Sequence, residues 1–402
     1  MKSRSIDETA RNAFMTAFGA RASVEARAPG RVELLGNHTD YNGGLVLAAA
    51  IDRYTVVAGR ATSGRVATVR SVQFNQEDVF TLDKIEPGEP SSWGRYMRGV
   101  AWAVQERFGP LCTGFEVVIS GNVPLGAGLS SSASLQASAA LFLLGLGQGG
   151  AADLDDAGRM DLAATLRRSE NEFVGVNSGL LDQFSVLFGR ADHALSLDCR
   201  TLEYERLPLG RPSPAIVVCD SKTSRRLADG MYNRRRVECE RIVTYFQVRG
   251  GKDAVQQLRD VTLDDLESAW NDLDPVGRKR ARHVLTENER VRQGADALKA
   301  GDLAAFGRLM SASHASSRDD FENSSQGLDA LIDAAEAAPG FLGGKLSGAG
   351  WAGCTVNLVQ TDRADDFAET VRVEHARRTG VTPDVHICQA AEGASSRIIA
   401  NS

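Results

Sequence analysis

The sequence contains few cysteines, and their spacing excludes the sites that cysteine usually builds. Only six of the 402 residues are cysteine, and no two of them form a C-x-x-C pair. A disulfide framework or a zinc site needs several closely spaced cysteine or histidine residues, so neither is predicted. The six are Cys112, Cys199, Cys219, Cys239, Cys354 and Cys388.

Long apolar runs and an excess of basic charge are also absent. The longest apolar stretch, residues 137–147, is about half as long as a membrane-spanning helix. The N-terminal residues lack the apolar core of a signal peptide. With 52 acidic and 46 basic residues, the net charge is -6, which gives no electrostatic footprint for nucleic acid or an anionic membrane. We therefore expect a cytoplasmic protein that binds neither nucleic acid nor membranes.

The length of the chain predicts two domains, because a single hydrophobic core rarely serves 402 residues. Prolines cluster between residues 208 and 214, directly before an apolar strand at 215–219. We place an N-terminal lobe at residues 1–205 and a C-terminal lobe at residues 206–402. Strands and helices are mixed without the regular alternation of a doubly wound sheet, which favours an α+β fold.

Periodicity and turn residues predict the main helices and strands. Apolar residues at helical spacing predict helices over residues 7–18, 93–108, 233–248 and from about 132. Apolar runs predict strands at residues 45–58, 115–120 and 354–359. Residues 55–62 and 65–70 are predicted to pair as a hairpin, with Ser63 and Gly64 at the turn.

The segment from Arg31 to Gly44, RVELLGNHTDYNGG, holds a high density of polar side chains. A hydroxyl-rich ligand needs hydrogen-bond donors and acceptors fixed in space, and a turn carrying His38, Asp40 and Asn42 supplies them. A polar loop between two strands explains the same residues, because Asn-Gly-Gly is an ordinary turn signal. From these residues alone, a sugar-binding site and a plain loop both remain open.

A glycine- and serine-rich stretch, PLGAGLSSSAS over residues 124–134, precedes the long predicted helix. Gly126 and Gly128 let the backbone approach an anion, and the serines place hydroxyls at a helix N-terminus. We interpret the stretch as a nucleotide-phosphate loop, distinct from a Walker A loop and from the dinucleotide fingerprint. A flexible turn with an N-capping serine is the alternative.

Two acidic residues after this loop suggest phosphoryl transfer. Glu170 and Asp182 are separated by a turn-like stretch that contains Gly175 and Gly179. Phosphoryl transfer needs oxygen ligands for magnesium and an acceptor for the proton of the attacking hydroxyl. One carboxylate with a serine hydroxyl would bind the metal, and the other would be the base. Solvated acidic residues are the alternative, which is the commoner fate of any single Asp or Glu.

Together with a third glycine-rich segment at residues 346–356, these motifs closely resemble those of the galactokinases. This family belongs to a superfamily of small-molecule kinases that includes the homoserine, mevalonate and phosphomevalonate kinases. Residues 31–44 are similar to the family's sugar signature, and residues 124–134 match its second motif nearly residue for residue. The resemblance spans nearly the whole chain and implies two α+β lobes with the active site in the cleft between them.

The resemblance also implies a role for each candidate site residue. Asp182 would accept the proton of the anomeric hydroxyl, while Arg31 holds it ionised and steadies the transferring phosphoryl group. The ligands of Mg²⁺ would be Ser132 and Glu170. The sugar would be contacted by Asn37, His38, Asp40, Gly179 and Tyr232. ATP would be bound by Trp93 near the adenine and, around the triphosphate, by Gly126, Ala127, Gly128, Leu129, Ser130 and Ser131.

One residue departs from the family pattern at the sugar site. Where the family usually has glutamate, this chain has Asn37, which can accept a hydrogen bond but lacks the charge. Hydrogen bonds to charged groups contribute about 1.5–3 kcal/mol against about 1 kcal/mol for neutral ones, so we expect the affinity or the preferred sugar to change. On this hypothesis, Asn37→Glu shifts the preference toward galactose. Ala349 and Ala352 also stand where glycine is frequent, which the third motif should tolerate.

The predicted activity is ATP-dependent phosphorylation of a sugar at its anomeric hydroxyl, with D-galactose as the expected substrate and Mg²⁺ as the metal. Because of Asn37, an amino sugar, a pentose or a uronic acid remains an alternative substrate. A non-catalytic sugar and nucleotide sensor is the alternative from another class, but a sensor has no need to keep the base, its arginine and both metal ligands. The sequence does not fix the oligomeric state, and a monomer is compatible with it.

Overall fold

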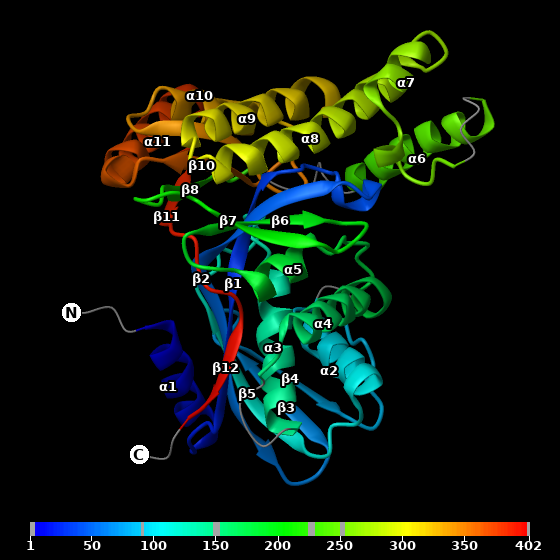
Figure 1. The fold of residues 1–402 in the computed structure, drawn as a ribbon. Coiled ribbons are helices and arrows are strands. Elements are labelled where there is room, and N and C mark those ends of the chain that lie inside the picture. The colour runs from blue at the N-terminus through cyan, green and yellow to red at the C-terminus, as the bar shows by residue number, and fades with distance from the viewer. Residues whose placement is uncertain (1–4, 90–91, 148–152, 224–229, 250–253, 400–402) are drawn as a thin grey trace.

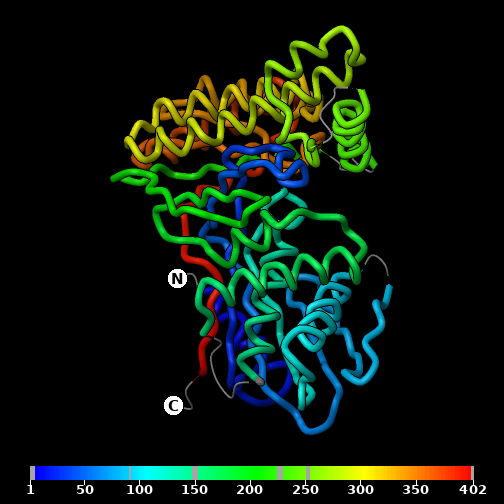
Figure 2. Tube along the Cα trace, turned by 45° about the vertical axis from the view of Figure 1, so that its right-hand side comes forward, coloured from blue at the N-terminus to red at the C-terminus, as the bar shows by residue number. Residues whose placement is uncertain are grey.

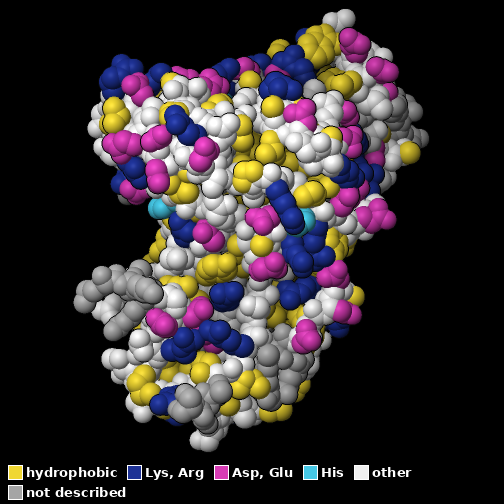
Figure 3. Space-filling view, turned by 60° about the vertical axis from the view of Figure 1, so that its left-hand side comes forward, with side chains coloured by type: hydrophobic (Ala, Val, Ile, Leu, Met, Phe, Trp, Pro, Cys, Tyr) yellow, Lys and Arg dark blue, Asp and Glu magenta, His cyan; other side chains and the backbone are white. Residues whose placement is uncertain are grey.

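The structure is a computed structural model that describes residues 5–89, 92–147, 153–223, 230–249 and 254–399. Figure 1 shows a lower part with one large sheet and an upper part made mostly of helices. The surface narrows between the two parts on the face seen in Figure 3. The combination of helices and strands confirms the predicted α+β class. In the described ranges, each helix is too short or too polar to span a membrane.

The large sheet is built mainly from the N-terminal half. Its strands follow the order β12-β1-β2-β5-β3-β4, while β6 pairs with β2 and β7 pairs with β6. The long antiparallel strands β1 and β2 extend from the lower part to the base of the upper part (Figures 1 and 2). The strands of this sheet are β1 Val24–Leu35, β2 Leu45–Thr62, β3 Val66–Ser71, β4 Gln76–Thr81, β5 Gly114–Gly121, β6 His193–Asp198, β7 Tyr204–Pro208 and β12 Ser395–Ile398.

The predicted hairpin between residues 55–62 and 65–70 is wrong. Both strands form and the chain turns near Gly64, but β5 lies between them, antiparallel to β2 and parallel to β3. The N–H of Gly114, at the start of β5, donates to the carbonyl of Gly64 (2.7 Å). The hairpin partner of β3 is β4. Turn residues mark where a strand ends, but they do not determine which strand takes the neighbouring place.

Helices cover both faces of the large sheet. One face packs against α2, α3, α4 and α5, and the Ala- and Leu-rich α3 is almost entirely buried there, as expected for a helix that is apolar on all sides. The opposite face is covered by α1, whose Phe14 packs against Val56 and Val118. These helices are α1 Ile6–Phe18, α2 Gly94–Phe108, α3 Ser131–Gly147, α4 Asp156–Arg168 and α5 Leu181–Phe188.

The upper part contains a four-stranded sheet in the order β11-β8-β10-β9. One face packs against α10 and α11, and the other shares a hydrophobic core with α8, α9 and the upper ends of β1 and β2. This shared core joins the two parts of the molecule. The strands are β8 Ala215–Asp220, β9 Phe341–Leu346, β10 Cys354–Val359 and β11 Asp384–Cys388. The helices are α6 Met231–Val248, α7 Leu263–Ser268, α8 Pro275–Lys299, α9 Leu303–Ser316, α10 Gln326–Glu336 and α11 Ala364–Thr379.

The end of the chain returns to the lower part. β12 pairs with β1, so residues 395–398 lie in the large sheet although most of the chain after residue 206 builds the upper part (Figure 1). Because β12 belongs to the large sheet, the last described residues pack with the N-terminal part of the chain. The division into lobes at residues 1–205 and 206–402 stays a prediction.

Candidate active site

Residues from all three sequence motifs line one cavity of about 700 Å³, a size typical of ligand pockets. Both parts of the molecule contribute to it. The first motif contributes Arg31, Glu33, Asn37, His38 and Asp40, the phosphate loop contributes Gly126, Gly128, Leu129, Ser130, Ser131 and Ser132, and the third motif contributes Ser347, Gly348, Ala349, Gly350 and Ala352. The other lining residues include Tyr96, Glu170, Ser178, Gly179, Asp182 and Tyr232.

Asp182 lies in the first turn of α5 and is held by two side chains. The Arg31 guanidinium donates through Nε (2.8 Å) and Nη2 (2.6 Å) to Oδ1, and its Nη1 donates to the carbonyl of Gly128 (2.6 Å). Ser130 donates its hydroxyl to Oδ2. The Asp182 side chain is 28% exposed, whereas Arg31 is almost fully buried. One arginine therefore ties the accessible carboxylate to the phosphate loop.

The phosphate loop adopts a backbone that suits glycine. Gly126, Gly128 and Ser130 have φ of 76°, 77° and 53°, in the region that glycine enters without steric cost. Ser130 has a side chain there, at a cost of about 1–3 kcal/mol, and its hydroxyl is held by Asp182. α3 begins at the next residue, Ser131, which lines the cavity. The positive end of a long helix dipole therefore lies at the cavity wall, where an anion is favoured.

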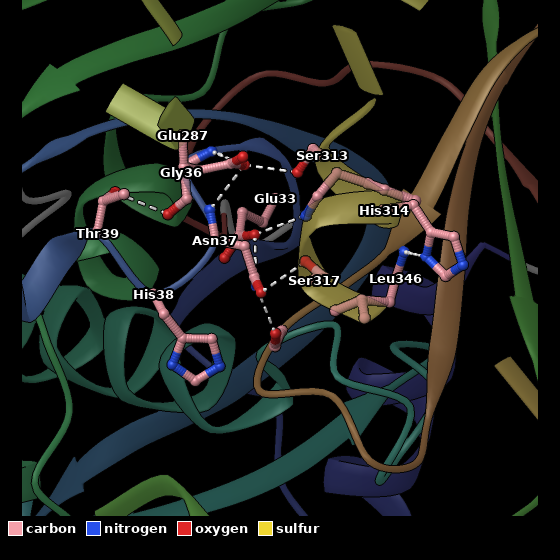
Figure 4. A network of polar contacts seen from close by, with 12 residues as sticks. Glu33, Gly36, Asn37, His38, Thr39, Glu287, Ser313, His314, Ser317 and Leu346 are labelled. Atoms are coloured by element: carbon pink, nitrogen blue, oxygen red, sulfur yellow. Dashed lines mark hydrogen bonds and ion pairs between the residues drawn. The ribbon is translucent and has the colours of Figure 1, made fainter. Parts of the chain in front are cut away.

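Helices α8 and α9 hold the backbone of the first motif (Figure 4). The buried Glu287 carboxylate accepts hydrogen bonds from the N–H groups of Gly36 (2.9 Å) and Asn37 (3.2 Å). The Ser313 hydroxyl (2.5 Å) and Arg290 (2.6 Å) also donate to it. Burial alone would raise the pKa of Glu287, but the neighbouring Arg290, His283 and Lys345, together with the hydrogen bond from Ser313, lower it to about 2. An ionised carboxylate on α8 therefore fixes the backbone of the first motif.

The side chain of Asn37 is fully buried and makes four hydrogen bonds (Figure 4). Its Nδ2 donates to Glu33 Oε1 (3.0 Å) and to the carbonyl of Gly348 (2.9 Å). Its Oδ1 accepts from Asn323 Nδ2 (2.9 Å) and from the Ser317 hydroxyl (3.3 Å). A side-chain amide has two donor hydrogens and two acceptor sites, so all four are used. The predicted contact between Asn37 and a sugar would require one of these bonds to break.

His38 joins the first motif to the third. Its Nε2 lies 3.0 Å from the carbonyl oxygen of Ala349, and its Nδ1 lies 2.9 Å from the Tyr41 hydroxyl. Because a carbonyl only accepts, the ring proton is assigned to Nε2, and Nδ1 accepts from Tyr41. Burial lowers the pKa of His38 to about 3, so the ring is neutral near pH 7. The predicted contact of His38 with the sugar remains a prediction, since both nitrogens are already bonded within the protein.

Asp40 and Gly179 lie against each other in the cavity wall. A Cβ atom at position 179 would come within 2.0 Å of Asp40 Oδ2, so glycine is needed for this close approach. Burial, together with the neighbouring Glu33 and Asp182 carboxylates, raises the pKa of Asp40 to about 7. Asp40 is therefore a carboxyl group that changes its charge near neutral pH.

Glu170 lies in a π-helical turn, η2 (Ser169–Val174), directly after α4. Its Oε2 accepts hydrogen bonds from the Ser178 hydroxyl (2.7 Å) and the Gln183 amide (2.6 Å), and burial raises its pKa. Ser132 lines the same cavity. Within the described ranges, no group of three or more His, Cys, Asp or Glu side chains is placed to hold a metal by itself. A hydroxyl and a carboxylate beside a phosphate loop nevertheless fit Mg²⁺, which takes its remaining ligands from phosphate oxygens and water.

Three of the predicted site residues do not line the cavity. Ala127 is buried within the phosphate loop. Trp93 directly precedes α2 and stacks on Phe74, with 6.2 Å between the ring centroids. Tyr96, in the first turn of α2, does line the cavity. A role for Trp93 near the adenine stays a prediction. Asn42, which the sequence offered as a further ligand contact, also lies outside the cavity wall and donates to the carbonyl of His38 (2.8 Å), while the residues assigned to the base, the metal, the sugar and the rest of the phosphate loop line the cavity.

Four residues that shape the site are missing from the sequence analysis: Glu33, Glu287, Asn323 and Lys345. Glu33 follows Arg31 by two positions, and side chains two positions apart lie on the same face of a strand. The alternation of side chains along this strand therefore indicated that Glu33 lies on the same face as Arg31. The other three bond to residues 250 or more positions away. No local pattern in the sequence indicates such partners.

Comparisons with known proteins agree on one family. The model described as the galactokinase galactose-binding signature matches residues 12–61, and the GHMP kinase N-terminal and C-terminal domain models match residues 95–190 and 295–375. A galactokinase of Roseiflexus sp. (strain RS-1) is 43% identical over 383 residues, which cover 95% of each protein. A galactokinase of Chloroflexus aggregans is 42% identical, covering 95% of this chain and 96% of that protein.

Solved structures give the same result. The crystal structure of Lactococcus lactis galactokinase complexed with galactose superposes with a TM-score of 0.88 at 32% identity, covering 96% of this chain and 98% of that one. The mevalonate kinase of Methanococcus jannaschii gives a TM-score of 0.65 at 16% identity, covering 92% and 99%. The second match shows a shared fold only.

Proposed function

Because the chain belongs to the galactokinase family, we propose that it transfers the terminal phosphoryl group of ATP to the anomeric hydroxyl of D-galactose. The observation that carries this proposal is the position of Asp182. Its carboxylate is accessible in a cavity lined by both the sugar motif and the phosphate loop, and Arg31 bonds to it and to the loop. This position supports a role for Asp182 as the proton acceptor between a sugar and a triphosphate.

Asp182 acts as the general base. Its Oδ1 already accepts two hydrogen bonds from Arg31, so Oδ2 is the oxygen that takes the proton of the anomeric hydroxyl. Ser130 now bonds to Oδ2, and its hydroxyl turns away when the sugar occupies that place. Arg31 stays beside the reacting groups, where its charge stabilises the negative charge of the transferring phosphoryl group.

The phosphate loop and the start of α3 bind the triphosphate. Backbone groups of residues 126–131 and the helix dipole favour its negative charge. Ser132 and Glu170 would hold Mg²⁺, which when bound neutralises charge on the phosphates. Trp93 would lie near the adenine, outside the cavity wall that Tyr96 of the same helix start lines. Since ATP is an intracellular substrate, we expect the enzyme to act in the cytoplasm.

The sugar is bound by the first motif and its neighbours. Asp40 accepts hydrogen bonds from sugar hydroxyls, and Gly179 leaves room for that carboxylate. Tyr232 and His38, whose ring centroids lie 5.3 Å apart, form an aromatic wall beside it. A coupled assay of ADP release with galactose, galactosamine, arabinose and galacturonate tests this assignment. The highest kcat/KM is expected for galactose, and a far higher value for another sugar would transfer the assignment to that sugar.

Sugar affinity is expected to fall below neutral pH. The pKa of Asp40 is about 7, so at pH 6 only about a tenth of the protein carries the ionised acceptor. The KM for sugar should therefore rise about tenfold between pH 8 and pH 6. His38 and His283 stay neutral in this range, because burial lowers their pKa values to about 3 and about 4. The measurement is KM against pH, and in Asp40→Asn the KM should be high but independent of pH.

A further inference from the structure

A second carboxylate, Glu33, lies beside Asn37 in the wall of the sugar cavity. Glu33 belongs to β1, and its side chain is only 6% exposed. Lys345, which is fully buried in β9, donates to Glu33 Oε1 at 2.7 Å. Asn37 Nδ2 donates to the same oxygen at 3.0 Å, and Figure 4 shows these two side chains facing each other. Among the described residues, none donates a hydrogen bond to Oε2. Glu33 therefore has one fixed oxygen and one that is free to accept.

The neighbouring Asn37 is in the opposite state. Both hydrogens of its amide group and both acceptor sites of its oxygen are used within the protein, and its exposed area is 0%. Its partners come from β1, the third motif and the segment after α9, so the amide fixes these elements relative to one another. An amide with this bonding is a structural link, and it has nothing left to offer a ligand.

We propose that Glu33 is the carboxylate that binds a non-anomeric hydroxyl of the sugar, in place of a carboxylate at position 37. Lys345 and Asn37 are the positioning residues that hold its Oε1, so that Oε2 accepts from the ligand. The inference rests on the proposed function and identifies a specificity-determining residue of the same site. It also explains how a chain with Asn37 keeps a charged acceptor in the sugar cavity.

The pairing has a consequence for position 37. In the Asn37→Glu variant, a second carboxylate would face Glu33 and the carbonyl of Gly348, where the amide now donates to both. Like charges in a buried site repel each other, so this variant should lose sugar affinity and stability. A gain in galactose preference, as expected from the sequence alone, would require Glu33 to be replaced at the same time.

The test combines Glu33→Gln with sugars that lack one hydroxyl each. For the wild type, galactose is compared with its 2-, 3-, 4- and 6-deoxy analogues by kcat/KM and by calorimetric binding. Loss of the hydroxyl that Glu33 binds should cost about 10- to 100-fold in the wild type, in the range of a charge-assisted hydrogen bond. In Glu33→Gln, the loss of kcat/KM and of affinity caused by removing that hydroxyl should be about tenfold smaller. The losses caused by removing the other hydroxyls should stay the same.

Glu25→Gln is the matched control. Glu25 is also a buried glutamate of β1, it is paired with Arg11 (3.0 Å) and Arg397 (2.5 Å), and it lies outside the cavity. This variant should leave the cost of every deoxygenation unchanged. If Glu33→Gln also leaves every cost unchanged, Glu33 is only a structural partner of Lys345 and the proposal is overturned.

A double exchange covers the case in which Glu33→Gln fails to fold. In Glu33→Asn with Asn37→Glu, one carboxylate and one amide remain beside Lys345, and sugar binding should exceed that of Asn37→Glu by about tenfold or more. Equal binding by the two variants would overturn the proposal. Failure of the proposed function looks different, because the wild type would then release no ADP with any sugar, while calorimetric binding still decides the role of Glu33.

Discussion

Replacing Asp182 by asparagine should lower kcat by about a thousandfold or more while sugar and ATP affinities change little. An amide cannot take the proton of the attacking hydroxyl, and a positioned general base contributes about 10²- to 10⁴-fold. Asparagine has almost the same shape as aspartate. Its oxygen can still accept from Arg31, and its NH₂ group can donate to the Ser130 hydroxyl where Oδ2 now accepts. The cavity should therefore keep its form.

The measurement separates chemistry from binding. Turnover is followed by ADP release, and the affinities for sugar and ATP are measured by calorimetry on the same preparation. Asp365→Asn is a suitable control, because Asp365 is an exposed acid in the first turn of α11. Residual turnover of Asp182→Asn close to that of the wild type would remove Asp182 as the base.

The local elements were predictable because they depend on nearby residues. A run of apolar residues indicated β10 at Cys354–Val359, and the serine-rich start indicated α3 within one residue. The hairpin failed because pairing depends on a strand some 50 positions away, β5, that enters between β2 and β3. The periodicity of apolar residues indicates which face of a helix or strand is buried, but it does not indicate which strands or helices pack beside it.

The same distinction applies to the site. Short motifs identified most of the residues that line the cavity, because phosphate and sugar binding demand particular residue types in one loop. The supports of the loop could not be found in this way. Glu287 and Lys345 look like ordinary charged residues in the sequence. Only the fold buries them and brings them into contact with Gly36 and Glu33 of the first motif. The sequence therefore predicted the residues of the cavity wall better than the residues that support them.

Replacing Lys345 by methionine should lower the free energy of unfolding by about 3–5 kcal/mol. Lys345 is 0% exposed and its only ion pair among the described residues is with Glu33, whose side chain is 6% exposed. Methionine has a similar volume but no charge, so it leaves the Glu33 carboxylate buried and nearly unpaired, which is the costly outcome for a buried ion pair. With total stabilities of about 5–15 kcal/mol, this loss is a large fraction of the whole. Urea unfolding followed by circular dichroism measures it.

Lys299→Met provides the comparison with an exposed pair. Lys299 ends α8 and pairs with Glu205 at 2.7 Å, and both side chains are about half exposed, so its replacement should change the free energy of unfolding far less than Lys345→Met does. An equal loss of stability in Lys299→Met and Lys345→Met would mean that the buried pair does not carry separated charges in the folded protein.

Adding Glu33→Gln to Lys345→Met should restore most of the lost stability, because removing both charges of a buried pair is often nearly neutral. The restored protein should nevertheless bind sugar weakly, because Glu33 is the proposed acceptor of a sugar hydroxyl. Stability and affinity would then move in opposite directions across the two variants. A double variant that regained both stability and sugar affinity would show that Glu33 serves only the fold. A double variant that regained stability but not affinity would show that Glu33 contacts the sugar, while Lys345 only supports Glu33.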